Sequence, residues 1–433
     1  MSIKKILFKN TFFNLLGYIY LLAASFLSIS IYLNNLGQDM FGIYIFLASF
    51  VPIASVFDFG VSIALIRDLA KNDTSLVEKK ESWQTGLYIF LIQAVILGIF
   101  FAGLILYFFY HLPLLTTIAN TTNIYTLAVI LGLTIFLNHV NNALLSIPQA
   151  FQRFDVYNSK TYLVGTANTL LSAWLTYYTK DLVHVFLLQL IFHAVTFFYA
   201  LNFGKKQIGK EILAPVYYKN AGRKLIAFGL KNFVGTLAGQ VEAQISKFFL
   251  GFLATAKSIT AFNIPQSIFM KGAGVVSQVA QAFFPLSATL LEKNRIKKLK
   301  KLYISLQFLI LFSGVFVVFL VFNFGEDFLT WWLKDLVVVS ASLPVLKIMS
   351  YYFVLVALTP LPTALAQGLG KPQVPSFFAV LTVTVETVFL SILVPKYHEI
   401  GAAYSFLISS IVSVPVFILY LSFLLNKKIN EYK

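Results

Sequence analysis

The chain has 433 residues, of which 58% are hydrophobic and only 12% are charged. Soluble domains carry about 25% charged residues, so this composition excludes an ordinary cytosolic protein. The formal net charge is +16 and cysteine is absent, which excludes disulfides and thiol chemistry.

Apolar windows long enough to cross a bilayer recur along the whole sequence. A helix of about 20 apolar residues spans roughly 30 Å of hydrocarbon, and about twelve such windows are present. Lipid offers the backbone no hydrogen-bond partner, so each window is predicted to be a helix. The predicted spans are 11–33, 40–64, 83–109, 124–147, 161–178, 182–204, 232–254, 259–285, 302–323, 343–366, 376–394 and 400–425.

The basic residues predict how the chain is oriented. Most of the 33 Lys and Arg lie in segments on the same side of the membrane as the N-terminus. Cytoplasmic loops carry such an excess, so both termini are predicted to be cytoplasmic and the first helix to remain uncleaved. We expect no nucleic-acid binding, because these bases are scattered over several loops and a tail rather than gathered in one patch.

The span order predicts two bundles that run in the same direction. The longest polar stretch, residues 205–231, separates six spans in residues 1–204 from six in residues 232–433, which end in a short cytoplasmic tail. An even number of spans per half is typical of a parallel repeat. We therefore predict an all-α polytopic membrane protein with a transporter-like fold, a basic cytoplasmic linker and a central cavity.

The sequence contains no motif for hydrolysis, nucleotide binding or dinucleotide binding. Its five histidines are scattered, so neither a metal site nor a cofactor is expected. Chemistry is therefore sought in the ionisable side chains inside the predicted spans, which are expensive in lipid and generally mark a substrate or ion path.

The seventh span carries a polar stripe. Gln240, Gln244 and Lys247 share one helical face at spacings of four and three residues. Lys271 follows in the next span at a similar depth. We interpret these four residues as candidate substrate contacts, with the two lysines meeting an anionic group. The alternative is that the lysines only neutralise buried acids as ion pairs.

Three intramembrane acids are candidates for ion coupling: Asp58, Glu242 and Glu386. A carboxyl at membrane depth is suited to proton or cation exchange. The competing interpretation is that each acid is simply a charge partner for one of the lysines.

The fourth and tenth spans have polar or broken stretches of their own. Asn138 and Asn142 share a face of the fourth span, and amides of this kind either bind sugar hydroxyls or join membrane helices. Pro360 and Pro362 interrupt the tenth span, and such breaks are tolerated beside cavities.

Short motifs along most of the chain carry a family resemblance. They are Leu36-Gly37, Phe41-Gly42-Ile43-Tyr44, Asp58-Phe59-Gly60 with Arg67, Gln152-Arg153-Phe154-Asp155, Lys247 with Phe249-Leu250-Gly251, Gln367-Gly368-Leu369-Gly370-Lys371-Pro372, and Pro395-Lys396-Tyr397 with Gly401-Ala402-Ala403. In order and spacing they resemble the polysaccharide flippases, including O-antigen flippases, of the multidrug/oligosaccharidyl-lipid/polysaccharide exporter superfamily.

This resemblance implies a flippase of the bacterial inner membrane rather than an enzyme. Its substrate would be a polyprenyl-pyrophosphate-linked oligosaccharide, such as an O-antigen, capsule or exopolysaccharide repeat unit, moved to the outer leaflet by alternating access. Membrane lipids and polysaccharide assembly proteins are the implied partners. In one respect the chain departs from the family: relatives place an acid directly before the base of the seventh helix, where this chain has Ser246, with Glu242 one turn earlier.

Three other functions fit the hydropathy. A multidrug cation antiporter of the same superfamily would favour a cavity of acids and aromatics, whereas this chain offers comparable numbers of lysines and acids. A peptidoglycan-precursor flippase commonly has more spans. A membrane oligosaccharide polymerase or ligase usually carries a sizeable outward loop with basic residues, and the predicted outward loops here are short.

Overall fold

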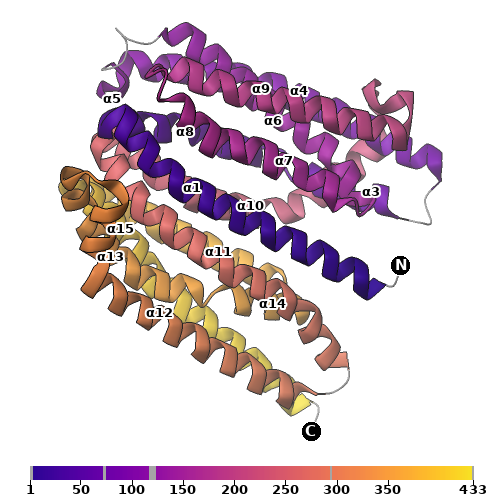
Figure 1. The fold of residues 1–433 in the computed structure, drawn as a ribbon. Helices are drawn as coiled ribbons and strands as arrows, with labels where there is room; N and C mark the ends of the chain where they lie inside the picture. Colours follow the sequence, from indigo (N-terminus) through magenta and orange to yellow (C-terminus); the bar gives the residue numbers. More distant parts are fainter. Residues whose placement is uncertain (1–2, 72–74, 117–122, 293–294, 432–433) are drawn as a thin grey trace. The chain divides into compact units, whose positions relative to one another are not determined.

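The computed structural model describes residues 3–71, 75–116, 123–292 and 295–431, and every regular element in these ranges is helical (Figure 1). The α-helices are α1 (Ile3–Ala48), α2 (Phe50–Val56), α3 (Val61–Ala70), α4 (Leu76–His111), α5 (Pro113–Thr116), α6 (Ile124–Ala150), α7 (Phe154–Thr166), α8 (Ser172–Leu175), α9 (Leu182–Ile208), α10 (Lys219–Leu253), α11 (Ala256–Glu292), α12 (Ile296–Leu333), α13 (Leu336–Ala357), α14 (Pro360–Gly368) and α15 (Gln373–Glu431). A π-helical turn, Ala167–Leu171, joins α7 to α8, and Lys210–Leu213 is a 3₁₀ turn.

The predicted all-α membrane fold is confirmed. Gly37 (φ 77°) interrupts α1 between the first and second predicted spans, and His398 (φ 48°) interrupts α15 between the eleventh and twelfth. The tenth span is broken between α13 and α14, as its prolines predict. Seven stretches of the described residues are individually long and apolar enough to cross a membrane, and the two longest, Tyr18–Val56 and Gln373–Lys428, each cover parts of two predicted spans.

Large apolar side chains on the outside of the helices explain why this fold needs lipid. Along α12, Phe308, Phe312 and Phe316 are 66%, 73% and 53% exposed. Their spacing of four residues places them on one face of the helix. An exposed apolar stripe of this length would be unstable in water, so it is a surface for acyl chains.

Polar caps begin the helices that start in turns. At the start of α4, the amide of Glu78 donates to the Ser75 hydroxyl (3.2 Å) and the amide of Ser75 donates to the Glu78 carboxylate (3.3 Å). Asn123 accepts from the amide of Thr126 before α6. These starts therefore follow from local sequence, because the caps satisfy amides that have no partner inside the helix.

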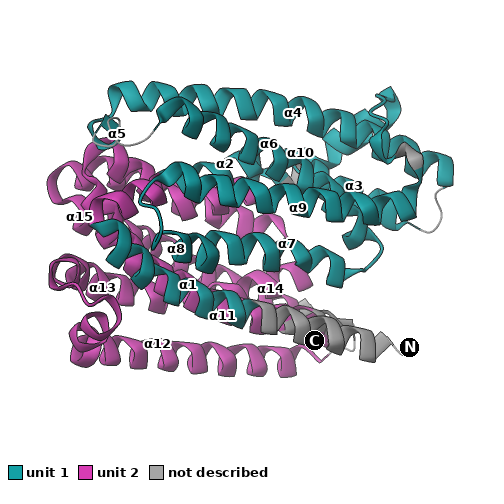
Figure 2. Ribbon diagram, turned by 45° about the horizontal axis from the view of Figure 1, so that its top comes forward, with its two compact units in different colours: residues 1–37, 47–234 teal, residues 38–46, 235–433 magenta. Residues whose placement is uncertain are grey.

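The chain divides into two compact units, coloured separately in Figure 2. Unit 1 consists of residues 1–37 and 47–234, and unit 2 of residues 38–46 and 235–433. Both α1 and α10 therefore contribute to each unit. The segment predicted as a linker, 205–231, is largely helical, because α9 ends at Ile208 and α10 begins at Lys219.

Unit 1 is built around α4, α6 and α9, which pack side by side. Trp83 of α4 is fully buried and donates its indole N–H to the carbonyl of Ile212 (3.2 Å). The amide of Tyr218 donates to the Thr85 hydroxyl (3.1 Å). The stretch between α9 and α10 is therefore held against α4 by these two hydrogen bonds.

Residues 38–46 pack with unit 2 through close backbone approaches. A Cβ built on Gly42 would lie 2.0 Å from the carbonyl oxygen of Ala256, so the α1 and α11 backbones touch there. The Phe46 ring lies 5.7 Å from that of Phe248, and the Thr260 hydroxyl donates to the Gln38 carbonyl (2.8 Å). Only a residue without a side chain fits at position 42.

The turn between α2 and α3 is a second close contact, within unit 1. Gly60 adopts φ 73° and Phe59 φ 51°, a left-handed turn that glycine tolerates best. Asp58 stabilises the turn by accepting from the Gly60 amide (2.7 Å) and from the Ser62 hydroxyl. The turn rests on Gly229 of α10, where an added Cβ would lie 2.4 Å from the Phe59 carbonyl oxygen.

We expect Gly229→Val to destabilise unit 1 strongly. The new side chain meets backbone atoms of the turn, which cannot move aside as a flexible side chain could. Overpacking of this kind costs about 1–3 kcal/mol, and more where backbone must shift. The matched control is Gly103→Val in α4, because a Cβ at Gly103 meets nothing within 4 Å. Melting temperatures in detergent should fall for the first variant only; equal melting temperatures would contradict the contact.

Candidate functional site

Unit 2 contains two carboxyls within the predicted membrane spans, Glu242 and Glu386. Glu386 of α15 is 0% exposed, and neither of its oxygens has a hydrogen-bond partner among the described residues. Glu242 of α10 and the phenol of Tyr352 lie near enough to interact with it electrostatically. We call Glu242 and Glu386 the carboxyl pair. A buried, unpartnered carboxyl is costly, which makes this pair a candidate for binding a proton or a cation.

Glu242 also lines a pocket of about 140 Å³ between α10, α13, α14 and α15. Its other polar lining residues carry hydroxyl groups: Thr359, Thr363, Thr382, Ser410 and Ser413. Hydroxyl and carboxylate oxygens suit water or a small cation better than an anion.

Two lysines of unit 2 lie near each other. Lys247 of α10 donates to the side-chain oxygen of Gln244 (2.8 Å), and its charge interacts repulsively with that of Lys271 in α11. We call Lys247 and Lys271 the lysine pair. Lys247 forms no salt bridge with an acid in the part of the chain that the structure describes. For Lys247, the ion-pair alternative considered from the sequence is therefore not the arrangement observed.

The polar stripe on α10 ends at the lysine pair. Gln244 and Lys247 are half-buried, and Gln240, one turn earlier, is exposed. Ser246 is fully buried and its hydroxyl has no partner among the described residues. The stripe thus continues from the lysine pair toward the start of the helix, with Glu242 on a different face.

Unit 1 contains a polar group that the sequence analysis recognised only in part. Asn138 and Asn142 of α6 do share a face, and both side-chain oxygens accept from the ammonium of Lys160 in α7 (2.8 and 2.7 Å). The amide nitrogen of Asn138 donates to the Ser55 hydroxyl of α2 (2.6 Å). We call Lys160, Asn138, Asn142 and Ser55 the Lys160 cluster. No acid forms a salt bridge with Lys160 among the described residues.

Lys160 was missed because the fifth span was predicted to begin one residue later, which placed this lysine in a cytoplasmic loop. In the structure α7 begins at Phe154. A salt bridge between Arg153 and Asp155 (2.8 Å) spans this first residue, and Arg153 lowers the pKa of the Asp155 carboxyl. A signal was present: Val156, Lys160 and Val164 recur at four-residue intervals, and both valines are buried. Helical periodicity carried past the apolar window would have placed Lys160 on the inner face.

Asp58, the third acid, differs from Glu386 because its oxygens accept hydrogen bonds. Its two oxygens are used at the α2–α3 turn, as described above. An ion-coupling role for Asp58 stays a prediction, and the observed contacts give it a role in stabilising the turn.

Comparison with known proteins assigns the chain to a family. The family described as "Polysaccharide biosynthesis protein" matches residues 7–291, which is more than half of the chain. The chain belongs to this family. A Shigella flexneri protein named "Putative O-antigen transporter" is 20% identical over 401 residues, which cover 92% of this chain and 93% of that protein.

Solved structures show the fold of this polysaccharide biosynthesis protein to be that of two-repeat membrane transporters. The lipid II flippase MurJ, in an inward closed conformation, matches with a TM-score of 0.75 and 14% identity, over 94% of this chain and 87% of that one. An inward-facing multidrug resistance MATE family transporter of the MOP superfamily matches with a TM-score of 0.71 and 16% identity, over 94% and 96%. The chain is therefore a multi-pass membrane protein with the fold of these transporters.

Proposed function

We propose that this chain is a flippase for polyprenyl-pyrophosphate-linked oligosaccharide. It would move an O-antigen, capsule or exopolysaccharide repeat unit from the inner to the outer leaflet of the bacterial inner membrane, by alternating access of its two bundles. The family membership and the O-antigen transporter relative support a lipid-linked sugar as substrate. The positive-inside distribution supports cytoplasmic termini.

The lysine pair is the observation that carries this proposal. Two lysines whose charges repel each other on consecutive helices of one unit form a site that favours an anion. A pyrophosphate supplies two adjacent negative charges and several acceptor oxygens, so it would relieve that repulsion and bind both lysines. Gln244 already orients the Lys247 ammonium, and Gln240 continues the polar surface for the attached sugar.

The carboxyl pair supports a coupling role beside the lysine pair. An acid that is fully buried without a hydrogen-bond partner is maintained at a cost in stability. Exchange of a proton or sodium ion at Glu242 and Glu386 would explain why the buried acid is kept, because it would link the ion gradient to the conformational cycle.

Reconstituted transport tests the proposal. Proteoliposomes would be loaded with fluorescent undecaprenyl-pyrophosphate-linked trisaccharide, and its appearance in the outer leaflet would be followed with a membrane-impermeant quencher. We expect transport above that of protein-free liposomes. Protein that is folded by its melting curve but moves neither this probe nor one with a charged sugar would contradict the flippase.

A multidrug cation antiporter is the second candidate, favoured by the carboxyl pair and by the similarity to MATE structures. The two functions differ in what the lysine pair does, because two ammonium groups repel a cationic drug. Uptake of ethidium driven by a proton or sodium gradient would support the antiporter. We expect no such uptake.

We also expect the Lys160 cluster to contact an anionic part of the substrate. Asn142→Asp tests this, because the substitution keeps the shape and hydrogen bond but gives Lys160 a carboxylate partner. The melting temperature should hold or rise, whereas transport should fall by about tenfold, the effect of one lost charge-assisted bond. Unchanged transport in Asn142→Asp would show that the cluster only holds α6 against α7.

A further inference from the structure

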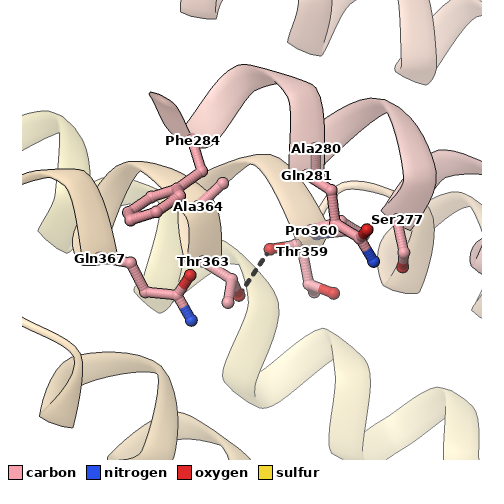
Figure 3. A pocket seen from close by; sticks show the side chains of 9 residues that line it. All are labelled: Ser277, Ala280, Gln281, Phe284, Thr359, Pro360, Thr363, Ala364 and Gln367. Atoms are coloured by element: carbon pink, nitrogen blue, oxygen red, sulfur yellow. Dashed lines mark hydrogen bonds between the residues drawn. The ribbon is translucent and has the colours of Figure 1, made fainter. Parts of the chain in front are cut away.

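A second pocket of unit 2 lies beside the break between α13 and α14. It has a volume of about 400 Å³, within the usual range of about 300–1,000 Å³ for ligand pockets. Figure 3 shows its lining, which comes from α11 and from the break and the helix that follows it. The lining residues are Ser277, Ala280, Gln281, Phe284, Thr359, Pro360, Thr363, Ala364 and Gln367. None of them carries a charge.

The hydroxyl groups of this pocket offer hydrogen-bond acceptors, and its amide groups offer both donors and acceptors. The hydroxyls of Ser277, Thr359 and Thr363 donate to the backbone carbonyls of Ala273, Val356 and Thr359 (3.1, 2.8 and 2.9 Å), so they present lone pairs to the pocket. Gln281 and Gln367 are exposed, and their side-chain amides form no hydrogen bond with the described residues. Each amide offers two donors and an acceptor. A ligand here must therefore both donate and accept.

The position of these amides indicates a surface that is not covered by acyl chains. Gln281 lies within the long helix α11, and Gln367 lies one turn before the turn at Lys371. Unsatisfied amides facing acyl chains cost several kcal/mol, so they belong to a surface that meets water or a polar ligand. Phe284 is 41% exposed in the same pocket and adds a flat apolar face.

We propose that this pocket binds a neutral sugar residue of the transported lipid-linked oligosaccharide. Sugar hydroxyls donate and accept at once, and the C–H face of a sugar ring packs on an aromatic ring. The absence of lysine, arginine or histidine from the lining disfavours phosphate, and the absence of acids disfavours a cationic drug. An acyl chain would leave both amides unpaired. The proposal rests on the proposed function, and it assigns the sugar and the pyrophosphate to different places.

The sugar pocket adjoins the pocket that contains Glu242. Thr359 and Thr363 line both, so the two share the wall formed at the α13–α14 break. This continuity connects the proposed sugar site with the candidate ion site in the same unit. The proline break thus opens space for ligand hydroxyls between two otherwise regular helices.

Binding to protein in nanodiscs tests the assignment with two probes. One probe is undecaprenyl pyrophosphate, and the other is the same lipid carrying a neutral trisaccharide that begins with N-acetylglucosamine. We expect the wild type to prefer the sugar-bearing probe. Gln281→Leu and Gln367→Leu should each weaken its binding by about five- to tenfold, as expected for one or two hydrogen bonds, and leave binding of the sugar-free probe unchanged.

Control variants separate sugar binding from folding. Thr363→Val removes an acceptor with little change of shape, and it should weaken the same probe if the leucine variants do not fold. Gln278→Leu lies on the same helix but outside the pocket lining, and should change neither affinity. Equal losses for both probes, or an unchanged preference for sugar, would overturn the sugar site while the flippase stands. A wild type that binds neither probe would instead overturn the proposed function.

Discussion

Replacing both members of the lysine pair with alanine should lower lipid-pyrophosphate transport by about a hundredfold. A charge-assisted hydrogen bond contributes about 1.5–3 kcal/mol, and every 1.4 kcal/mol is about tenfold, so two lost contacts reach this range. The measurement is the initial rate of outer-leaflet appearance in proteoliposomes. Lys247→Ala and Lys271→Ala alone should each give a smaller loss, of about tenfold.

The stability of the same variants distinguishes a binding role from a structural one. Lys247 forms no salt bridge among the described residues and its charge is repelled by that of Lys271, so Lys247→Ala should leave the melting temperature unchanged or raise it. If the lysines neutralised buried acids, their removal would instead lower stability by about 3–5 kcal/mol. Lys347→Ala is the control, because this lysine lies over the Phe322 ring (5.6 Å) and should not affect transport.

Glu386→Leu should make the protein more stable and less active. The wild-type carboxyl is fully buried with no hydrogen-bond partner among the described residues, a situation that costs about 1–3 kcal/mol or more. Leucine removes that cost with a similar volume, so the melting temperature in detergent should rise. Stimulation of transport by a proton or sodium gradient should be lost, because the exchangeable group is gone.

Two comparisons make the Glu386 prediction specific. Glu386→Gln keeps a polar group in place, so it should lose coupling without the gain in stability. Asp58→Ala should lower the melting temperature, because both Asp58 oxygens accept hydrogen bonds at the α2–α3 turn. If Glu386→Leu were strongly destabilised, the carboxyl would have a bound partner in the native protein, and its role as an exchange group would need a tightly held cation.

The glycines in the family motifs show how much of the packing can be predicted from local sequence. Gly42, Gly60 and Gly251 belong to motifs by which the resemblance was recognised, and each proves to be a close approach: to the Ala256 carbonyl, to Gly229 and to the Phe46 ring. The sequence shows only that these glycines lie in motifs that carry the family resemblance. What each glycine contacts lies far away in the chain, so the contact could not be predicted without the fold.

The candidate site was predictable to the extent that it depends on periodicity along one helix. The stripe of Gln240, Gln244 and Lys247 follows from helical spacing, and the hydrogen bond between Gln244 and Lys247 agrees with it. Asn138 and Asn142 were placed on one face for the same reason. Their partner Lys160 comes from another helix, and only the packing of α6 against α7 brings it there.

By itself, the sequence determined that this is an all-α membrane protein and where the polar stripes lie, because the low charge content and the length of the apolar windows leave the backbone no other way to satisfy its hydrogen bonds in lipid. Only the tertiary structure decided which polar groups meet. It joined Lys160 to two asparagines, left Glu386 without a hydrogen-bond partner among the described residues, and placed uncharged donors and acceptors at the α13–α14 break. The physical reason is that these encounters depend on how helices distant in sequence pack, and spacing along one helix carries no information about that.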